Sequence, residues 1–117
     1  MKGFGTEIRN LRERLSKDSK EFSVRRVAAK IGVEPAYLSK VEREVVSPPS
    51  EVKIIALAKV LGADEDVLLA LAGKVSSDLL RIIKDRPILF AELIRKLKEE
   101  PDHAVLRVVR EVKDGDW

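Results

Sequence analysis

Apolar side chains recur every three or four positions along most of the chain, and no segment shows the strict alternation of a half-buried strand. The first apolar stripe consists of Phe4, Ile8, Leu11 and Leu15. This spacing predicts a helix over 6–16, and a polar connector over 16–22 separates it from the next stripe. The pattern as a whole therefore predicts an all-α fold.

Residues that favour helix ends divide the next part of the chain into four short helices. Ser23 is a good N-cap for a second helix, which we expect to end at Gly32. Pro35 suits the first turn of a third helix, which should end near Arg43. A fourth helix should follow the N-cap Ser50 and stop at Gly62, with apolar positions Val52, Ile55, Ala56, Leu57, Ala58 and Leu61. A fifth helix follows, with Asp64 as its N-cap and Gly73 after its end.

Three further amphipathic helices are expected after a boundary near 73–76. Their sequences are "SSDLLRIIKD" (76–85), "PILFAELIRKLKEE" (87–100) and "HAVLRVVREV" (103–112). These apolar stripes are too rich for a free tail. We therefore divide the chain into 1–73 and a helical region, 74–117, which either forms a dimerisation or partner-binding surface or extends the core of the monomer.

Composition excludes several classes of site. The 117 residues include no cysteine, so disulfides and thiolate metal sites are excluded. The sole histidine, His103, sits at a polar helix end, and the carboxylates over 64–66 are ordinary for the start of a helix. No phosphate-binding loop or nucleophile motif is present. We therefore expect neither an enzyme nor a bound cofactor or metal, and the absence of a membrane-length apolar run or a signal sequence favours a cytoplasmic protein.

Positive charge is concentrated in the N-terminal half. Residues 1–50 contain 11 Lys/Arg and 7 Asp/Glu, whereas residues 51–117 contain 12 and 13. A basic excess of this kind indicates a polyanionic partner for the N-terminal half.

The segment "SVRRVAAKIGVEPAYLSKVE", residues 23–42, has the pattern of two short helices joined by a tight turn. Its apolar positions are Val27, Ile31, Val33, Leu38 and Val41. Ala28 is small where the two helices must approach each other, and Gly32 lets the backbone turn without steric penalty. Such a pair of helices is a helix-turn-helix, whose second helix can enter the major groove of DNA.

Residues from about 5 to 73 resemble the XRE or Cro/repressor-like family of five-helix DNA-binding domains. The resemblance is carried by "IRNLRERL", "SVRRVAAKIGVEPAYLSKVER", "PPSEVKIIALAKVLG" and "ADEDVLLALAG". Two features depart from the family pattern. The connector after the first helix is longer, and it either contacts phosphate through Lys17 and Lys20 or is a mobile loop. Glu34 stands where the family usually has Ser or Thr.

The resemblance also implies roles for individual residues. It implies that Ala36, Ser39 and Lys40 contact bases, because Lys can donate to guanine, Ser can bond to several base edges, and Ala can touch a thymine methyl group. The expected contacts to the DNA backbone are Arg25, Arg26, Tyr37 and Arg43. Each has a plainer alternative, since Lys40 and the arginines could be solvated surface residues and Tyr37 could cover the edge of the core. Arg12 and Glu42 match a structural pair of the family.

The function implied is that of a sequence-specific DNA-binding transcriptional regulator. We expect a dimeric repressor that binds a palindromic operator in double-stranded DNA, because one helix-turn-helix contacts only a few base pairs. The alternative is an antitoxin or a phage-type repressor, whose C-terminal helices would bind a toxin or a protease as a protein partner.

Overall fold

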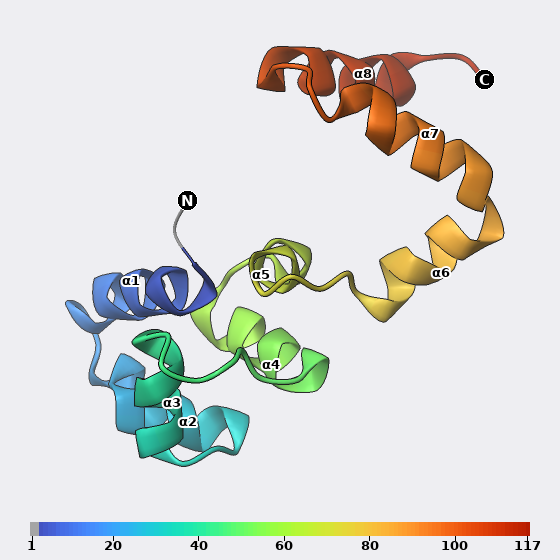
Figure 1. Ribbon diagram of the computed structural model, residues 1–117. Coiled ribbons are helices and arrows are strands. Elements are labelled where there is room, and N and C mark those ends of the chain that lie inside the picture. The colour runs from blue at the N-terminus through green and yellow to red at the C-terminus, as the bar shows by residue number, and fades with distance from the viewer. Residues whose placement is uncertain (1–2) are drawn as a thin grey trace. The chain divides into compact units, whose positions relative to one another are not determined.

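The computed structural model describes residues 3–117, and all its regular elements are helical, which confirms the expected all-α class (Figure 1). In chain order they are α1 (Phe4–Ser16), a 3₁₀ helix η1 (Lys20–Phe22), α2 (Val24–Ile31), α3 (Pro35–Glu42), α4 (Glu51–Leu61), α5 (Glu65–Leu71), α6 (Ser77–Asp85), α7 (Pro87–Leu97) and α8 (Asp102–Asp114). Among the residues described, no helix combines the length and apolarity that a membrane crossing needs.

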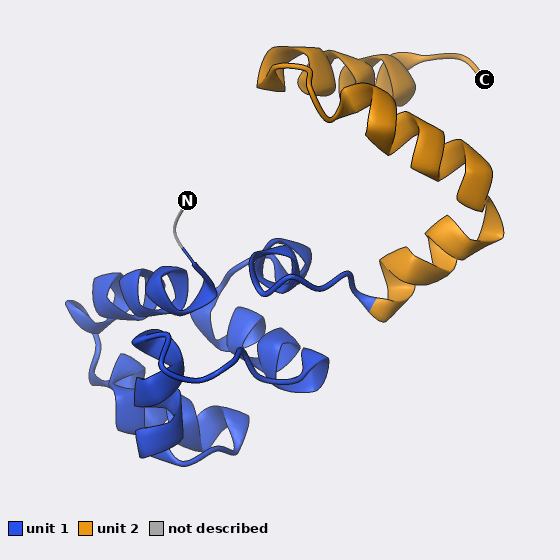
Figure 2. Cartoon of the chain, viewed as in Figure 1, with its two compact units in different colours: residues 1–76 blue, residues 77–117 orange. Residues whose placement is uncertain are grey.

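The chain divides into two compact units, residues 1–76 and residues 77–117 (Figure 2). We call them unit 1, which contains α1 to α5, and unit 2, which contains α6 to α8. The apolar side chains that are buried in the described chain lie between Phe4 and Leu69. The hydrophobic core therefore belongs to unit 1.

The core of unit 1 is formed by the inward faces of all five α-helices. Its buried members are Phe4, Ile8, Val27, Ala28, Ile31, Leu38, Val41, Ile54, Leu57, Ala58, Leu61, Leu68 and Leu69. Helices α2 and α3 have only eight residues each, and helices of that length are unstable alone in water. Packing on this core therefore holds both helices in place.

Several helix ends follow the local signals in the sequence. The hydroxyls of Ser23 and Ser50 each accept a hydrogen bond from the amide N–H three residues later, and the Asp64 carboxylate accepts from two amides of α5. Gly32 and Gly62 follow α2 and α4 with φ of 74° and 66°, in the left-handed region. These caps confirm the predicted boundaries of α2, α4 and α5.

Three features of unit 1 differ from the sequence prediction. Helix α1 begins at Phe4, two residues before the predicted start. The Phe4 side chain is buried in the core, and this packing stabilises the additional residues at the start of the helix. The connector contains η1, and its Phe22 is half-buried against the core. Val52 is 72% exposed, whereas Ile54 is fully buried. The core-facing stripe of α4 is thus Ile54, Leu57, Ala58 and Leu61.

The first turn of α1 lies directly against the end of α3. Gly5 is buried there, and a Cβ at this position would collide with the carbonyl oxygen of Val41. The carboxylate of Glu44 lies beside the same turn and accepts a long hydrogen bond from the amide of Thr6, at 3.5 Å. Close approach of the two backbones therefore needs a residue without a side chain at Gly5.

Unit 2 consists of three helices with no buried residue. Helices α6 and α7 contact each other, and Pro87 begins α7, as the sequence predicts. Helix α7 ends at Leu97, three residues before the predicted end at 100. After α8, the indole Nε1 of Trp117 donates to the carbonyl of Val112 at 3.1 Å.

Candidate nucleic-acid interface

The turn between α2 and α3 is built around Gly32. The amide N–H of Val33 donates to the carbonyl of Ala28 at 2.9 Å, and this bond closes the end of α2 while Gly32 adopts its left-handed conformation. Pro35 then begins α3, and the side chain of Glu34 makes no cap. The chain turns tightly enough for α3 to pack against α2.

Helix α3 has one face in the core and one face in solvent. Leu38 and Val41 are almost completely buried. Ala36 and Lys40 are exposed, as is Arg43, which follows the helix. The spacing of the buried pair thus determines which residues α3 presents to a partner.

The other predicted contact residues of α3 are less accessible. Ser39 and Tyr37 are half-buried, and Tyr37 packs against the core cluster. This position is compatible with a ring that covers the edge of the core and has its remaining surface in solvent.

An ion pair between Arg12 and Glu42 fixes α3 against α1. The guanidinium donates from Nε to Oε2 at 2.7 Å and from Nη2 to Oε1 at 2.9 Å, and both side chains are at most 10% exposed. The pKa of Arg12 is raised, chiefly because its guanidinium donates to Glu42. A third bond, from Nη1 to the carbonyl of Phe22 at 3.2 Å, ties the connector to the same pair.

The start of α2 presents two arginines with different surroundings. Arg25 is exposed. Arg26 is also exposed, but its guanidinium lies 3.2 Å from a carboxylate oxygen of Glu21, whose other oxygen lies 3.4 Å from Lys30. Lys30 in turn lies over the ring of Phe22, 5.1 Å from its centroid. A carboxylate therefore already occupies the space between two cations of this surface.

A small hollow of about 180 Å³ lies where α1, α2 and α3 meet. It is lined by Arg9, Arg12, Val24, Ser39, Glu42 and Arg43. Two of these, Ser39 and Arg43, are predicted DNA contacts. Arg9 is an addition that sequence reasoning missed, although the stripe of α1 already placed it on the solvent side of that helix. Arg9 is half-exposed, and it donates to Glu13 at 2.7 Å.

Lys53 of α4 donates hydrogen bonds to the backbone of the turn between α2 and α3. Its ammonium donates to the carbonyl of Ile31 at 2.8 Å and, less closely, to the carbonyl of Gly32 at 3.4 Å. Carbonyl groups at a helix C-terminus lack partners within the helix, so a cation there satisfies them and interacts favourably with the helix dipole. Lys53 therefore links α4 to the helix-turn-helix.

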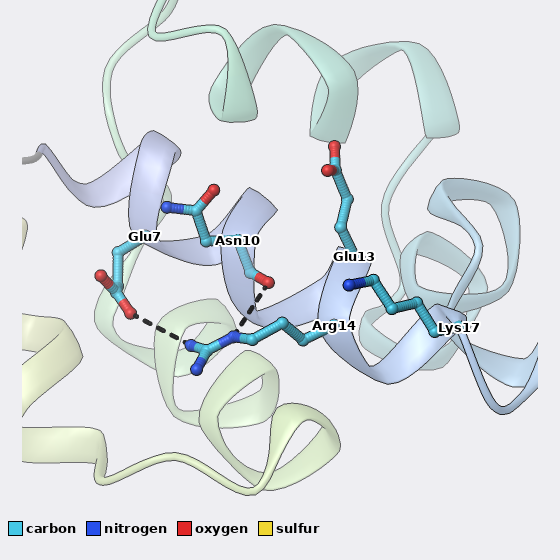
Figure 3. Close-up of a pocket in the computed structure, with 5 residues that line it drawn as sticks. All are labelled: Glu7, Asn10, Glu13, Arg14 and Lys17. Carbon is cyan, nitrogen blue, oxygen red and sulfur yellow. Dashed lines mark hydrogen bonds and ion pairs between the residues drawn. The ribbon is translucent and has the colours of Figure 1, made fainter.

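A second, larger hollow lies on a different face of α1. It has a volume of about 390 Å³ and is lined by Glu7, Asn10, Glu13, Arg14 and Lys17 (Figure 3). The Arg14 guanidinium donates to the backbone carbonyl of Asn10 at 3.4 Å and lies 4.0 Å from the carboxylate of Glu7, and both interactions are marked in Figure 3. This hollow contains none of the predicted DNA contacts. Within residues 3–117, no cluster of three or more His, Asp or Glu side chains is arranged to hold a metal ion.

Comparison with known proteins agrees with this geometry. A family model described as a helix-turn-helix domain matches residues 4–71, which is more than half of the chain. The match runs from the first residue of α1 to the last residue of α5. Searches of curated proteins and of solved structures find no match.

Proposed function

Since the chain belongs to the helix-turn-helix domain family, which is found in XRE-like transcriptional regulators, we propose that it is a repressor that binds a specific DNA sequence. One observation carries the proposal. Helix α3 is anchored by buried Leu38 and Val41, and it presents Ala36 and Lys40 to solvent. An exposed helix on a rigid helix-turn-helix has the size and position needed to enter a major groove.

In this proposal, three residues of α3 contact bases. Lys40 donates to guanine O6 and N7, Ser39 bonds to a neighbouring base edge, and Ala36 contacts a thymine methyl group. The exposure of Lys40 and Ala36 supports these roles. The Arg12–Glu42 pair contributes indirectly, because it holds the end of α3 against α1.

Phosphate contacts come from the cations around α3. Arg25, Arg26 and Arg43 are all exposed, and Arg43 shares the small hollow with Arg9. We assign these four residues to the DNA backbone, together with the part of Tyr37 that remains in solvent. Such contacts orient the protein on DNA without reading its sequence.

In this proposal, the protein binds DNA as a homodimer on a palindromic operator. One α3 contacts only a few base pairs, so a two-fold dimer with its recognition helices about 34 Å apart gives the specificity that a single copy lacks.

Selection of bound sequences from a random DNA pool with the purified full chain tests this function. We expect one palindromic sequence to be enriched, and its affinity to fall at least about tenfold between about 50 and 200 mM salt, because Lys and Arg contacts release condensed counterions. Absence of enrichment together with a flat salt response would refute the proposal. An enriched site without two-fold symmetry would refute the dimer alone.

A further inference from the structure

Unit 2 has apolar helices but no core. None of the residues in α6, α7 or α8 is buried, whereas unit 1 buries thirteen apolar side chains. Helices of 9, 11 and 13 residues are marginal alone in water, so they need an apolar partner to persist. Within unit 2, α6 and α7 contact each other, but the apolar side chains of the three helices are at most partly buried.

The exposed apolar surface of unit 2 is large for a chain of its size. Its large hydrophobic side chains with more than a third of their surface in solvent are Leu79, Leu80, Ile82, Ile88, Leu89, Leu93, Ile94, Leu106, Val109, Val112 and Trp117. Summed over these side chains, at about 100 Å² for each, the exposed apolar area is on the order of 1,000 Å², which is comparable with the roughly 800 Å² that each partner buries in a stable dimer.

Charge distinguishes between the classes of partner that could cover this surface. Residues 77–117 contain nine Lys/Arg and nine Asp/Glu, so unit 2 has no net charge and the formal charge of +3 lies entirely in unit 1. A neutral surface does not favour DNA or a strongly charged protein. It does allow two identical surfaces to meet without net repulsion, with cations of one copy near anions of the other.

We infer that unit 2 is a self-association module, in which α6, α7 and α8 of two copies bury their apolar faces against each other and build the core that one copy lacks. A two-fold interface places the same residues on both sides, so one apolar surface is sufficient. Helix formation in unit 2 is then coupled to association. The inference deepens the proposed dimer by naming its surface, and it can fail while unit 1 still binds DNA.

The test compares two pairs of substitutions in the full chain, without DNA. Ile94→Asp and Val109→Asp place a carboxylate on exposed apolar positions of α7 and α8, which are 56% and 57% exposed. Val52→Asp and Val67→Asp are matched controls on α4 and α5, which are the other helices that could form a dimer interface; these positions are 72% and 56% exposed. Sedimentation velocity over a wide concentration range gives the dissociation constant of each variant.

We expect the wild-type chain to dimerise, and each unit 2 substitution to raise the dissociation constant at least about tenfold, while the two controls leave it unchanged. Circular dichroism of the wild-type chain should show helix content falling on dilution, with unit 1 still folded. A wild-type chain that stays monomeric with full helix content would overturn the inference, and so would a dimer disrupted only by the controls. A monomer whose unit 2 becomes helical only with a different protein, such as a toxin or a protease, would overturn it as well.

Unfolding of unit 1 cannot imitate the expected result. Each variant is also tested for DNA binding at high protein concentration and for the thermal unfolding of unit 1. If a unit 2 variant loses association but keeps the unfolding temperature of unit 1, the substitution acted within unit 2. If all four variants dimerise like the wild type, unit 2 is not the interface and the inference is wrong.

Discussion

Arg12 of α1 and Glu42 of α3 are separated by thirty residues in sequence, and their side chains form two parallel hydrogen bonds in a site that is almost closed to solvent. Removing one partner leaves a buried charge without compensation, which costs about 3–5 kcal/mol. We therefore expect Arg12→Met to lower the free energy of unfolding by about 3 kcal/mol, as measured by urea denaturation. The double variant with Arg12→Met and Glu42→Leu should recover most of this loss, because no charge then remains in the core. A double variant as unstable as Arg12→Met would contradict this account of the pair.

Lys53 gives a second prediction about the position of α3. Charge-assisted hydrogen bonds contribute about 1.5–3 kcal/mol, and Lys53 is partly exposed, so Lys53→Met should destabilise unit 1 by about 1–2 kcal/mol. Because the turn loses its support, affinity for the selected DNA should fall even where the protein remains folded. Lys59→Met is the matched control, since Lys59 is exposed on the same helix. Equal effects of the two substitutions on stability and binding would show that the hydrogen bond to Ile31 has no special role.

The sequence was sufficient for features that depend on neighbouring residues. Ser23, Ser50 and Gly32 act within one helical turn of their own positions, so the boundaries of α2 and α4 could be predicted. The burial of Ile54 could not, because α4 is apolar on several faces and its periodicity does not select the one that meets the core. The hydrogen bond between Lys53 and Ile31 spans 22 residues and depends on how α4 packs on α2, which local patterns do not specify.

Arg9 provides a test of the small hollow between α1, α2 and α3. If a phosphate of bound DNA lies there, Arg9→Ala should weaken binding to every sequence and reduce the slope of log affinity against log salt by about one. Arg14→Ala is the control on α1, because Arg14 lines the other hollow. NMR titration verifies the starting geometry: the hydrogen bond from Arg9 lowers the pKa of Glu13, so this pKa should rise in Arg9→Ala. Equal losses of affinity in both variants would place the phosphate elsewhere.

Glu21 should limit the affinity of unit 1 for DNA. Its carboxylate lies between Arg26 and Lys30, where it competes with a phosphate for the same cations. All three side chains are more than a third exposed, and surface pairs of this kind contribute little to stability, so Glu21→Gln should leave the unfolding temperature unchanged. Its affinity for random DNA at low salt should rise about 2–10-fold, because a like charge is removed and Arg26 is released, while Lys30 keeps its hydrogen bond to the backbone carbonyl of residue 21. Glu65→Gln, with the same change in net charge at the start of α5, is the control. An equal rise in both variants would be an effect of net charge alone.

Lys40→Ala and Arg26→Ala should impair DNA binding in different ways. Lys40 lies on the exposed face of α3, because Leu38 and Val41 turn the opposite face into the core. Without the hydrogen bonds from Lys40 to a base, affinity for the selected site should fall by about 1–3 kcal/mol and the preference at one position should weaken, with little change on random DNA.

Arg26 is assigned to phosphate, so Arg26→Ala should weaken binding to specific and random DNA alike and reduce the slope of log affinity against log salt. Binding of both variants to both kinds of DNA, at two salt concentrations, separates the roles. If Lys40→Ala weakens specific and random DNA equally, Lys40 binds the backbone and another face of α3 recognises the bases.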